Sequence, residues 1–251
     1  MTVLLVRLGG EEDPVRRMQM LNDVARIDPE QARLVLLGVL QADLSPDVRS
    51  HVARIFAWRG TSDDVLALSG QLRKEPVAQV RREILSAIDL IGGEASDETL
   101  LSLLGDSDVR IREGAATALS HREDPDLSWA LASVAAGDDP AAAQAAKLAL
   151  AGMRAPQGTA VLLADLYRAR SDEDLVSAVQ AVSRALDPSA RASAVPVLAS
   201  LLNSTETTMA VREEIILAMG KMPDEDAHRL LHSYLQVEPD VSLRRRGAYE
   251  L

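Results

Sequence analysis

The sequence of 251 residues predicts an all-α, right-handed solenoid of about seven helical hairpins followed by a terminal helix. A short motif recurs with a period in the low thirties, and apolar residues at helical spacing follow each copy. Acidic residues, Pro or Ser precede each copy. A fixed period of this length is typical of stacked hairpins, because one hairpin alone cannot bury its apolar face.

The recurring motif is a small apolar residue followed by Arg, and its clearest copy lies in residues 106–119. The arginines of six copies are separated by 33, 32, 29, 102 and 32 residues. The step of 102 equals three units of 34, so two degenerate copies without the Arg fill the gap. They begin at Asp138 and Ser171. The six arginines are Arg16, Arg49, Arg81, Arg110, Arg212 and Arg244.

Each unit is predicted to consist of two helices. An Asp beside Pro or Ser opens the first helix, because its carboxylate accepts hydrogen bonds from free N–H groups of the first turn. Glycine near the end of that helix (Gly60, Gly92-Gly93, Gly152 and Gly220) is expected to adopt positive φ. The expected pairs of helices are 14–27 with 29–41, 46–59 with 62–74, 76–91 with 96–104, 108–121 with 125–136, 140–153 with 156–169, 172–186 with 189–203, and 209–222 with 224–236.

These pairs predict one repeat domain over residues 1–251. Residues 1–12 would be an irregular N-terminal segment or cap, residues 13–236 seven repeats, and residues 237–251 a terminal half repeat. A short strand and a helical remnant are alternatives for residues 1–12. Pro196 either kinks the second helix of the sixth unit or marks its true start.

The pattern Asp-x-x-Val-Arg-x-x-Ala-x-x-Ala-Leu resembles HEAT repeats, in the short form shared with bacterial HEAT proteins and phycobilin lyases. The resemblance extends over about residues 13–251. In that family an Asp near the turn and the Arg of the next helix tend to form a ladder between neighbouring units. The resemblance therefore implies that the six arginines named above are ladder residues. The two middle copies, which lack the Arg, would interrupt the ladder.

Composition and charge exclude several functions. Hydrophobic residues make up 47% of the chain but aromatic residues only 2%, so the predicted core is aliphatic and no base-stacking or flat cofactor site is expected. The net charge of −11 argues against nucleic-acid binding, which relies on Lys and Arg. Solubility is the simpler explanation of this acidity, and a partner protein with a basic surface is the alternative.

Cysteine is absent, which excludes disulfides and thiolate chemistry and is typical of a cytoplasmic protein. The apolar stretch within residues 1–10 is too short for a signal peptide or a membrane span. We therefore expect no membrane insertion.

One group of residues could bind a metal. Asp224, His228 and His232 are spaced by four residues and share one stripe of a helix. Helix capping by the Asp and packing of the two His beside the core are the favoured interpretation. Deoxyhypusine hydroxylase, a HEAT-like di-iron enzyme, uses repeated His-Glu pairs, and this sequence contains none. No metal site or catalytic residue is therefore predicted.

Other notable residues have structural explanations. Acidic clusters at residues 11–13, 138–139 and 172–174 coincide with helix starts and are expected to cap them. In the basic run 244–246, one Arg would belong to the ladder and the others would face solvent. Trp58 and Trp129 could contact a partner, but partly buried packing is favoured for both.

The predicted function is a non-catalytic protein-binding scaffold or adaptor that uses the concave surface lined by the second helices. The alternative is a lyase or chromophore-handling subunit resembling the phycobilin lyases, and the scarcity of aromatic residues and the absence of Cys count against it. A HEAT-like DNA glycosylase would need a basic groove, which the net charge disfavours.

Overall fold

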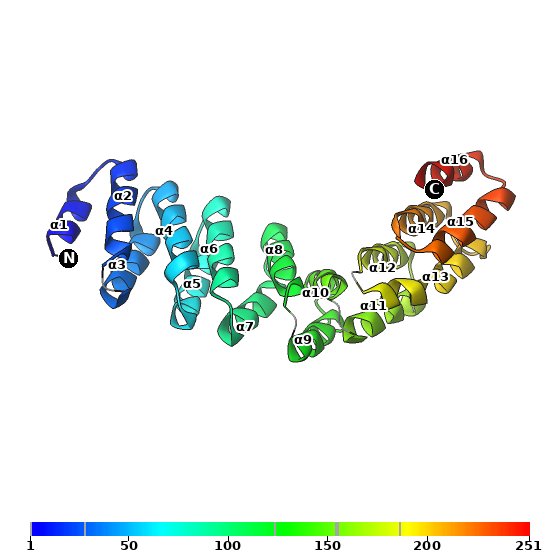
Figure 1. Ribbon diagram of the computed structural model, residues 1–251, viewed down its shortest axis with the longest axis horizontal. Coiled ribbons are helices and arrows are strands. Elements are labelled where there is room, and N and C mark those ends of the chain that lie inside the picture. Colours follow the sequence, from blue (N-terminus) through cyan, green and yellow to red (C-terminus); the bar gives the residue numbers. More distant parts are fainter. Residues whose placement is uncertain (1, 28, 123, 154–155, 186) are drawn as a thin grey trace. The chain divides into compact units, whose positions relative to one another are not determined.

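The computed structural model describes residues 2–27, 29–122, 124–153, 156–185 and 187–251. Within these residues the protein consists of 16 α-helices and has no strands (Figure 1). The prediction of an all-α solenoid is confirmed. No helix in the described part of the chain is both long enough and apolar enough to cross a membrane.

The helices alternate between a first and a second member of each hairpin. The first helices are α2 (Pro14–Ala25), α4 (Pro46–Arg59), α6 (Ala78–Ile91), α8 (Val109–Ser120), α10 (Pro140–Gly152), α12 (Asp172–Arg184) and α14 (Met209–Lys221). The second helices are α3 (Pro29–Ala42), α5 (Ser62–Lys74), α7 (Glu94–Leu103), α9 (Pro125–Ala135), α11 (Pro156–Arg168), α13 (Pro188–Asn203) and α15 (Glu225–Val237). Helices α1 (Thr2–Gly10) and α16 (Val241–Glu250) lie at the two ends of the chain.

These bounds agree with the predicted pairs to within about two residues. Two open questions are also answered. Residues 2–10, for which helix, strand and irregular cap were open, are helical. Helix α13 begins at Pro188 and continues through Pro196, which therefore does not mark its start. Pro196 has no N–H to donate to the carbonyl of Ala192, four residues earlier. Both residues are exposed, so water can donate to that carbonyl instead.

The expectation of positive φ is correct for Gly92 and Gly93 and wrong for the other three glycines. Gly92 has φ of 68° and ends α6, as predicted. Gly60 has φ of −66° instead, and a Cβ atom there would lie 2.6 Å from Cδ1 of Ile91. Gly152 and Gly220 likewise face neighbouring side chains at less than 3.0 Å from a hypothetical Cβ. Close packing, not backbone conformation, explains glycine at these three positions.

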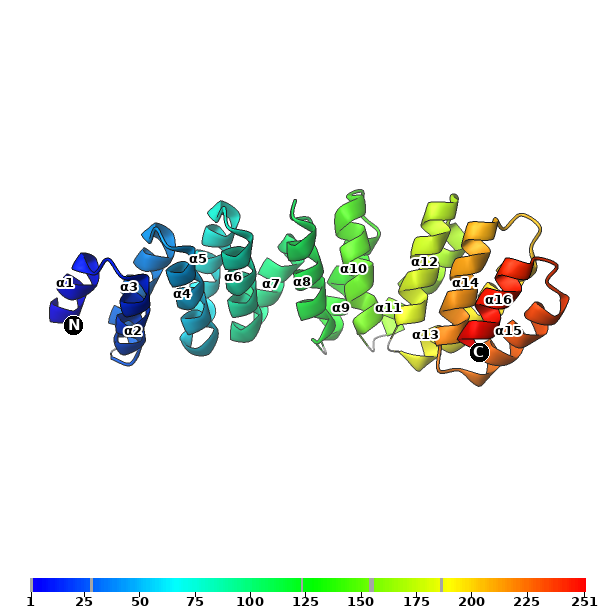
Figure 2. The ribbon, with the colours of Figure 1, turned by 90° about the horizontal axis from the view of Figure 1, so that it is seen from above.

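The chain forms two compact units, Met1–Leu119 and Ser120–Leu251, which meet in sequence at the end of α8. In the first unit, α2, α4 and α6 pack side by side in one layer, and α3, α5 and α7 form the second layer (Figure 2). In the second unit, α10, α12, α14 and α16 form the first layer, and α9, α11, α13 and α15 the second. The predicted single domain over 1–251 stays a prediction.

The core of each unit lies between its two layers and is aliphatic, as the composition predicted. In the first unit Leu21, Val52 and Leu68 are fully buried. In the second unit Val182, Leu198 and Ile215 are fully buried. Burial of one such side chain contributes about 1.5–3 kcal/mol, so packing between hairpins dominates stability.

Acidic residues cap many of the helices. Asp13, Asp139 and Asp240 each accept hydrogen bonds from N–H groups in the first turn of α2, α10 and α16. In the cluster 172–174 the cap is the preceding Ser171, whose hydroxyl accepts from the N–H of Asp174. Capping by an acidic residue therefore explains the clusters 11–13 and 138–139, whereas residues 172–174 stand in the first turn of α12 after a Ser cap.

Candidate binding surfaces

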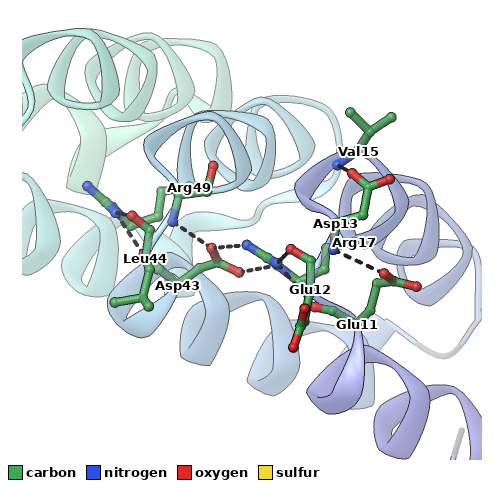
Figure 3. Close-up of polar contacts among 9 residues, drawn as sticks. Glu11, Glu12, Asp13, Val15, Arg17, Asp43, Leu44 and Arg49 are labelled. Carbon is green, nitrogen blue, oxygen red and sulfur yellow. Dashed lines mark hydrogen bonds and ion pairs between the residues drawn. The ribbon is translucent and has the colours of Figure 1, made fainter.

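A ladder of arginine contacts runs along the turns that connect one hairpin to the next (Figure 3). Arg17, the fourth residue of α2, donates from Nη1 to the carbonyl oxygens of Glu11 (3.1 Å) and Glu12 (2.8 Å). The same guanidinium donates from Nε and Nη2 to the carboxylate of Asp43, at 2.9 and 2.8 Å. Arg17 therefore ties the turn before its own hairpin to the turn before the next hairpin.

The next hairpins repeat this arrangement. Arg49 of α4 donates to the carbonyl of Asp43 (2.7 Å) and to both oxygens of the Glu75 carboxylate (2.9 and 2.7 Å). Arg81 of α6 donates to the carboxylate of Asp106 at 2.8 and 2.9 Å. Each carboxylate also accepts from a backbone N–H two residues later, as Asp43 does from Ser45 at 2.8 Å. One carboxylate thus binds the preceding hairpin and orders the start of the following one.

Two ladder residues were assigned to the wrong arginine, one residue too early in the first hairpin and two residues too early in the fourth. Arg16 is exposed and has only long contacts to Glu11 (3.9 Å) and Asp13 (3.7 Å), while Arg17 makes the ladder contacts. Arg110 is exposed, and Arg112 instead donates to the carbonyl of Asp106 at 2.7 Å. The ladder arginine is always the fourth residue of its helix, whereas the sequence alignment followed the Val-Arg pair.

The ladder resumes at the C-terminal end. Arg212 donates to the carbonyl of Ser204 at 2.8 Å and lies 3.8 Å from the Glu238 carboxylate. Arg244 donates to the carbonyls of Glu238 (2.7 Å) and Pro239 (3.0 Å). The buried hydroxyl of Tyr234 donates to Glu238, and burial together with this hydrogen bond raises the pKa of Tyr234 to about 12. In the basic run, Arg245 and Arg246 are exposed, as predicted.

The pair of Arg49 and Glu75 is the most enclosed contact of the ladder among the described ion pairs. The side chains are 10% and 1% exposed. Burial opposes ionisation of Glu75, but the hydrogen bonds from Arg49 and from the N–H of Val77 outweigh it and hold its pKa below the ordinary value. The same contact raises the pKa of Arg49, so both groups are charged at neutral pH.

The ladder is interrupted in the two middle hairpins. The fourth residues of α10 and α12 are Ala143 and Leu175, and the turn positions that elsewhere carry the carboxylate are Gly137 and Ala169. Ala143 and Ala169 line a cleft of about 620 Å³ at the place that the ion pair occupies in other hairpins. The interruption was predicted from the missing Arg, but the simultaneous loss of the carboxylate was not.

Other polar contacts are made by the middle hairpins. The hydroxyl of Ser177 on α12 donates to Oε1 of Gln144 on α10 at 2.8 Å. Lys147 of α10 forms an ion pair with Asp165 of α11 at 2.8 Å. The first helices are therefore joined here by one hydrogen bond between uncharged side chains, not by a buried guanidinium.

The three candidate metal ligands have separate partners. Asp224 caps α15 and accepts from the N–H groups of Asp226 and Ala227. The ring of His228 contacts the carbonyl of Gly220 at 3.2 Å, and the ring of His232 contacts Gln236 at 3.1 Å. In the part of the chain that the structure describes, no three His, Asp or Glu side chains are grouped as metal ligands.

The two tryptophans are not packed in the core, contrary to the favoured interpretation. Trp58 on α4 is 88% exposed and Trp129 on α9 is 63% exposed. Both lie on helix faces that the neighbouring hairpins leave uncovered. The sequence does not predict this exposure, because in a helical pattern an exposed apolar residue cannot be distinguished from one in the core.

The second helices α3 and α5 of the first unit each carry an exposed leucine and a glycine, and these four residues are called the strip below. Leu34 on α3 and Leu66 on α5 are 74% and 82% exposed. Each is followed four residues later by a glycine, Gly38 and Gly70, which lies on the same helix face. A hydrogen bond joins α3 to the first turn of α5, because Arg33 of α3 donates to the carbonyl of Asp63 at 2.8 Å.

A model of HEAT repeats matches residues 66–151. Residues 66–151 are therefore similar to HEAT repeats. The match covers the third and fourth hairpins, where the ladder arginines Arg81 and Arg112 lie. No curated protein matches the sequence.

The solved structures to which this chain is similar include the following three. Human deoxyhypusine hydroxylase in complex with glycerol has 18% identity over 93% of this chain and 95% of its own, with a TM-score of 0.41. A designed armadillo repeat protein has 17% identity over 73% and 97%, with a TM-score of 0.38. A Kap121p mutant has 11% identity over 96% and 29%, with a TM-score of 0.47. Likenesses this distant carry no information about activity.

Removing a buried ladder partner should be far more costly than removing an exposed Arg. We expect Arg49→Ala to lower the free energy of unfolding by about 3–5 kcal/mol, because it leaves Glu75 buried and unpaired. Arg16→Ala should change it by less than about 0.5 kcal/mol. Urea unfolding followed by circular dichroism measures both values, and equal effects of the two substitutions would contradict the assignment of the ladder residues.

The ladder should also make stability depend on acid pH. The folded pKa of Glu75 lies below its unfolded value, so its contribution is complete above the ordinary pKa near 4.5 and is lost as the pH falls through the folded pKa. Between pH 5 and 3, the free energy of unfolding of Glu75→Gln should fall less steeply than that of the wild type. Parallel slopes in urea titrations at several pH values would refute this.

An ion pair like those of the ladder should form in the middle hairpins when its two residues are introduced there. Positions 143 and 169 are separated by 26 residues, as are Arg49 and Glu75. The double substitution Ala143→Arg with Ala169→Glu should therefore restore an ion pair in the existing cleft. A double-mutant cycle should give a favourable coupling of about 0.5–3 kcal/mol. Strict additivity of the two single effects would show that the geometry of the gap differs.

Proposed function

We propose that this protein is a non-catalytic scaffold that binds a partner protein through the second helices of its first unit. The observation that supports this most directly is the strip formed by Leu34, Gly38, Leu66 and Gly70. Leu34 and Leu66 are more than 70% exposed on neighbouring second helices, and a partner that covers them would remove their apolar surface from water. The face that carries Leu34 lies opposite the buried residues of α3, so no hairpin of the unit covers it.

The two glycines support contact with another chain. Glycine inside a helix costs about 1 kcal/mol relative to Ala. A Cβ atom at Gly38 or Gly70 would have no atom within 4 Å, so packing inside the protein does not require glycine there. A partner that approaches the helix backbone closely supplies a reason for both glycines, because each leaves a shallow depression beside an exposed leucine.

Charge indicates the chemistry of the partner. Exposed carboxylates of Glu30, Asp63 and Glu94 stand in the first turns of α3, α5 and α7, in the layer that carries the strip. A partner with an apolar patch and basic residues along one side would match this surface. This is the basic partner that the net charge suggested as an alternative.

Alanine at the two glycines should raise stability but weaken binding. We expect Gly38→Ala with Gly70→Ala to increase the free energy of unfolding by about 1 kcal/mol per site, because Ala has the higher helix propensity. The added methyl groups fill the two depressions, so the partner should bind more weakly. Urea unfolding and affinity capture of the same variant measure the two effects. Unchanged binding by this more stable variant would contradict the role of the glycines.

Charged residues on the strip should abolish capture of the partner. Proteins captured by the wild type should be lost with Leu34→Asp plus Leu66→Asp and retained with Leu90→Asp, which alters an exposed leucine of the other layer. Hydrogen exchange in the complex should show protection of the amides of α3 and α5. Capture that survives the double substitution, with protection confined to turns, would overturn the proposed surface.

A further inference from the structure

A cleft of about 580 Å³ lies between α2 and α4, on the first-helix layer of the first unit. Its lining includes Arg26 at the end of α2 and Arg54, Trp58 and Arg59 on α4. No carboxylate lines it. A cleft of this composition is notable in a chain with a net charge of −11, and its volume lies in the usual range for ligand sites.

The arginines of the cleft are available to an incoming anion. Arg54 forms an ion pair with Glu83 of α6 at 3.1 Å, with half of the Arg54 side chain exposed. Arg26 lies 3.5 Å from Asp23, and both side chains are more than 60% exposed. Exposed pairs of this kind contribute at most about 1 kcal/mol, so a ligand competes with them easily. Arg59 forms no ion pair within the described residues.

Trp58 gives the cleft an apolar wall. Its side chain is 88% exposed, and no other side chain of the unit shields it from water. Large exposed aromatic residues beside arginines are typical of the centres of protein interfaces. An apolar side chain of a ligand can pack against the indole while its charged groups reach Arg54 and Arg59.

The floor of the cleft is fixed by His51. Its Nε2 is 2.9 Å from Oδ1 of Asn22, so the ring joins α4 to α2. Burial, reinforced by the nearby Arg54, lowers the pKa of His51 below its ordinary value. The imidazole is therefore neutral at pH 7, and the positive charge of the cleft comes from the arginines alone.

We infer that this cleft binds a short acidic segment of a partner protein, with one apolar side chain on Trp58 and flanking carboxylates on Arg54 and Arg59. From His51 to Trp58 the helix rises about 10 Å, the length of about three extended residues. A nucleic acid would extend beyond the cleft over an acidic protein and would need more cations than it offers. This surface lies on the opposite layer from the leucine strip and does not depend on it.

Tryptophan fluorescence tests the inference directly, because the chain has two tryptophans. In the variant Trp129→Phe, Trp58 is the sole reporter. We expect saturable blue-shifted emission when a capped peptide of two glutamates, one leucine and two glutamates is added. The peptide with glutamine in place of glutamate should bind at least tenfold more weakly, and raised salt should weaken the acidic peptide similarly.

Matched variants separate the cleft from general electrostatic attraction. Arg54→Ala with Arg59→Ala, in the Trp129→Phe background, should weaken binding at least tenfold, whereas Arg110→Ala, which removes an exposed arginine of α8, should not. Thermal melting confirms that each variant is folded. The inference is overturned if acidic and glutamine peptides bind alike, if Arg110→Ala has the larger effect, or if ATP or a single-stranded oligonucleotide binds more tightly than the peptide.

Discussion

The fold depends on a buried contact between an arginine and a carboxylate that is repeated from hairpin to hairpin. A buried charge is stable only when it is paired and hydrogen-bonded. Arg49 meets this condition with the two oxygens of Glu75 on one side and the carbonyl of Asp43 on the other. Because Glu75 also accepts from the N–H of Val77, the same carboxylate fixes where α6 starts. Helix start and hairpin stacking are therefore set by one group.

The middle hairpins show what replaces this contact. Ala143 and Ala169 remove both charges together, which avoids leaving one buried charge without a partner. The hydrogen bond between Ser177 and Gln144 then joins α10 to α12, and the alanine-rich α10 lets neighbouring helices approach closely. Aliphatic packing, together with this hydrogen bond, therefore replaces the charged ladder in this region. The first unit, by contrast, combines a charged ladder with two uncovered surfaces, one on each layer.

Most of the fold follows from the sequence, because helical periodicity and caps such as Asp13 and Asp139 are local features. Identifying the ladder arginines from the sequence requires one further step. Counting from the first residue of the helix identifies Arg17 and Arg112, whereas the Val-Arg pair led to Arg16 and Arg110. Exposure of Trp58 and Leu66 could not be predicted, since only the packed hairpins decide which helix face stays uncovered. The cleft beside Trp58 combines residues of two helices and has no linear signature.

The regular spacing of the ladder residues means that whole hairpins can be deleted from or added to the coding sequence with the ladder contacts kept. Asp43 and Glu75 each stand two residues before the N–H that they cap and six residues before the next ladder arginine, Arg49 or Arg81. Excising 45–76 would join Leu44 to Val77 and leave Asp43 in the place of Glu75, with every distance along the chain preserved. An in-frame duplication would insert a hairpin by the same logic. Such arrays can thus gain or lose whole hairpins while every buried ladder arginine keeps a carboxylate partner.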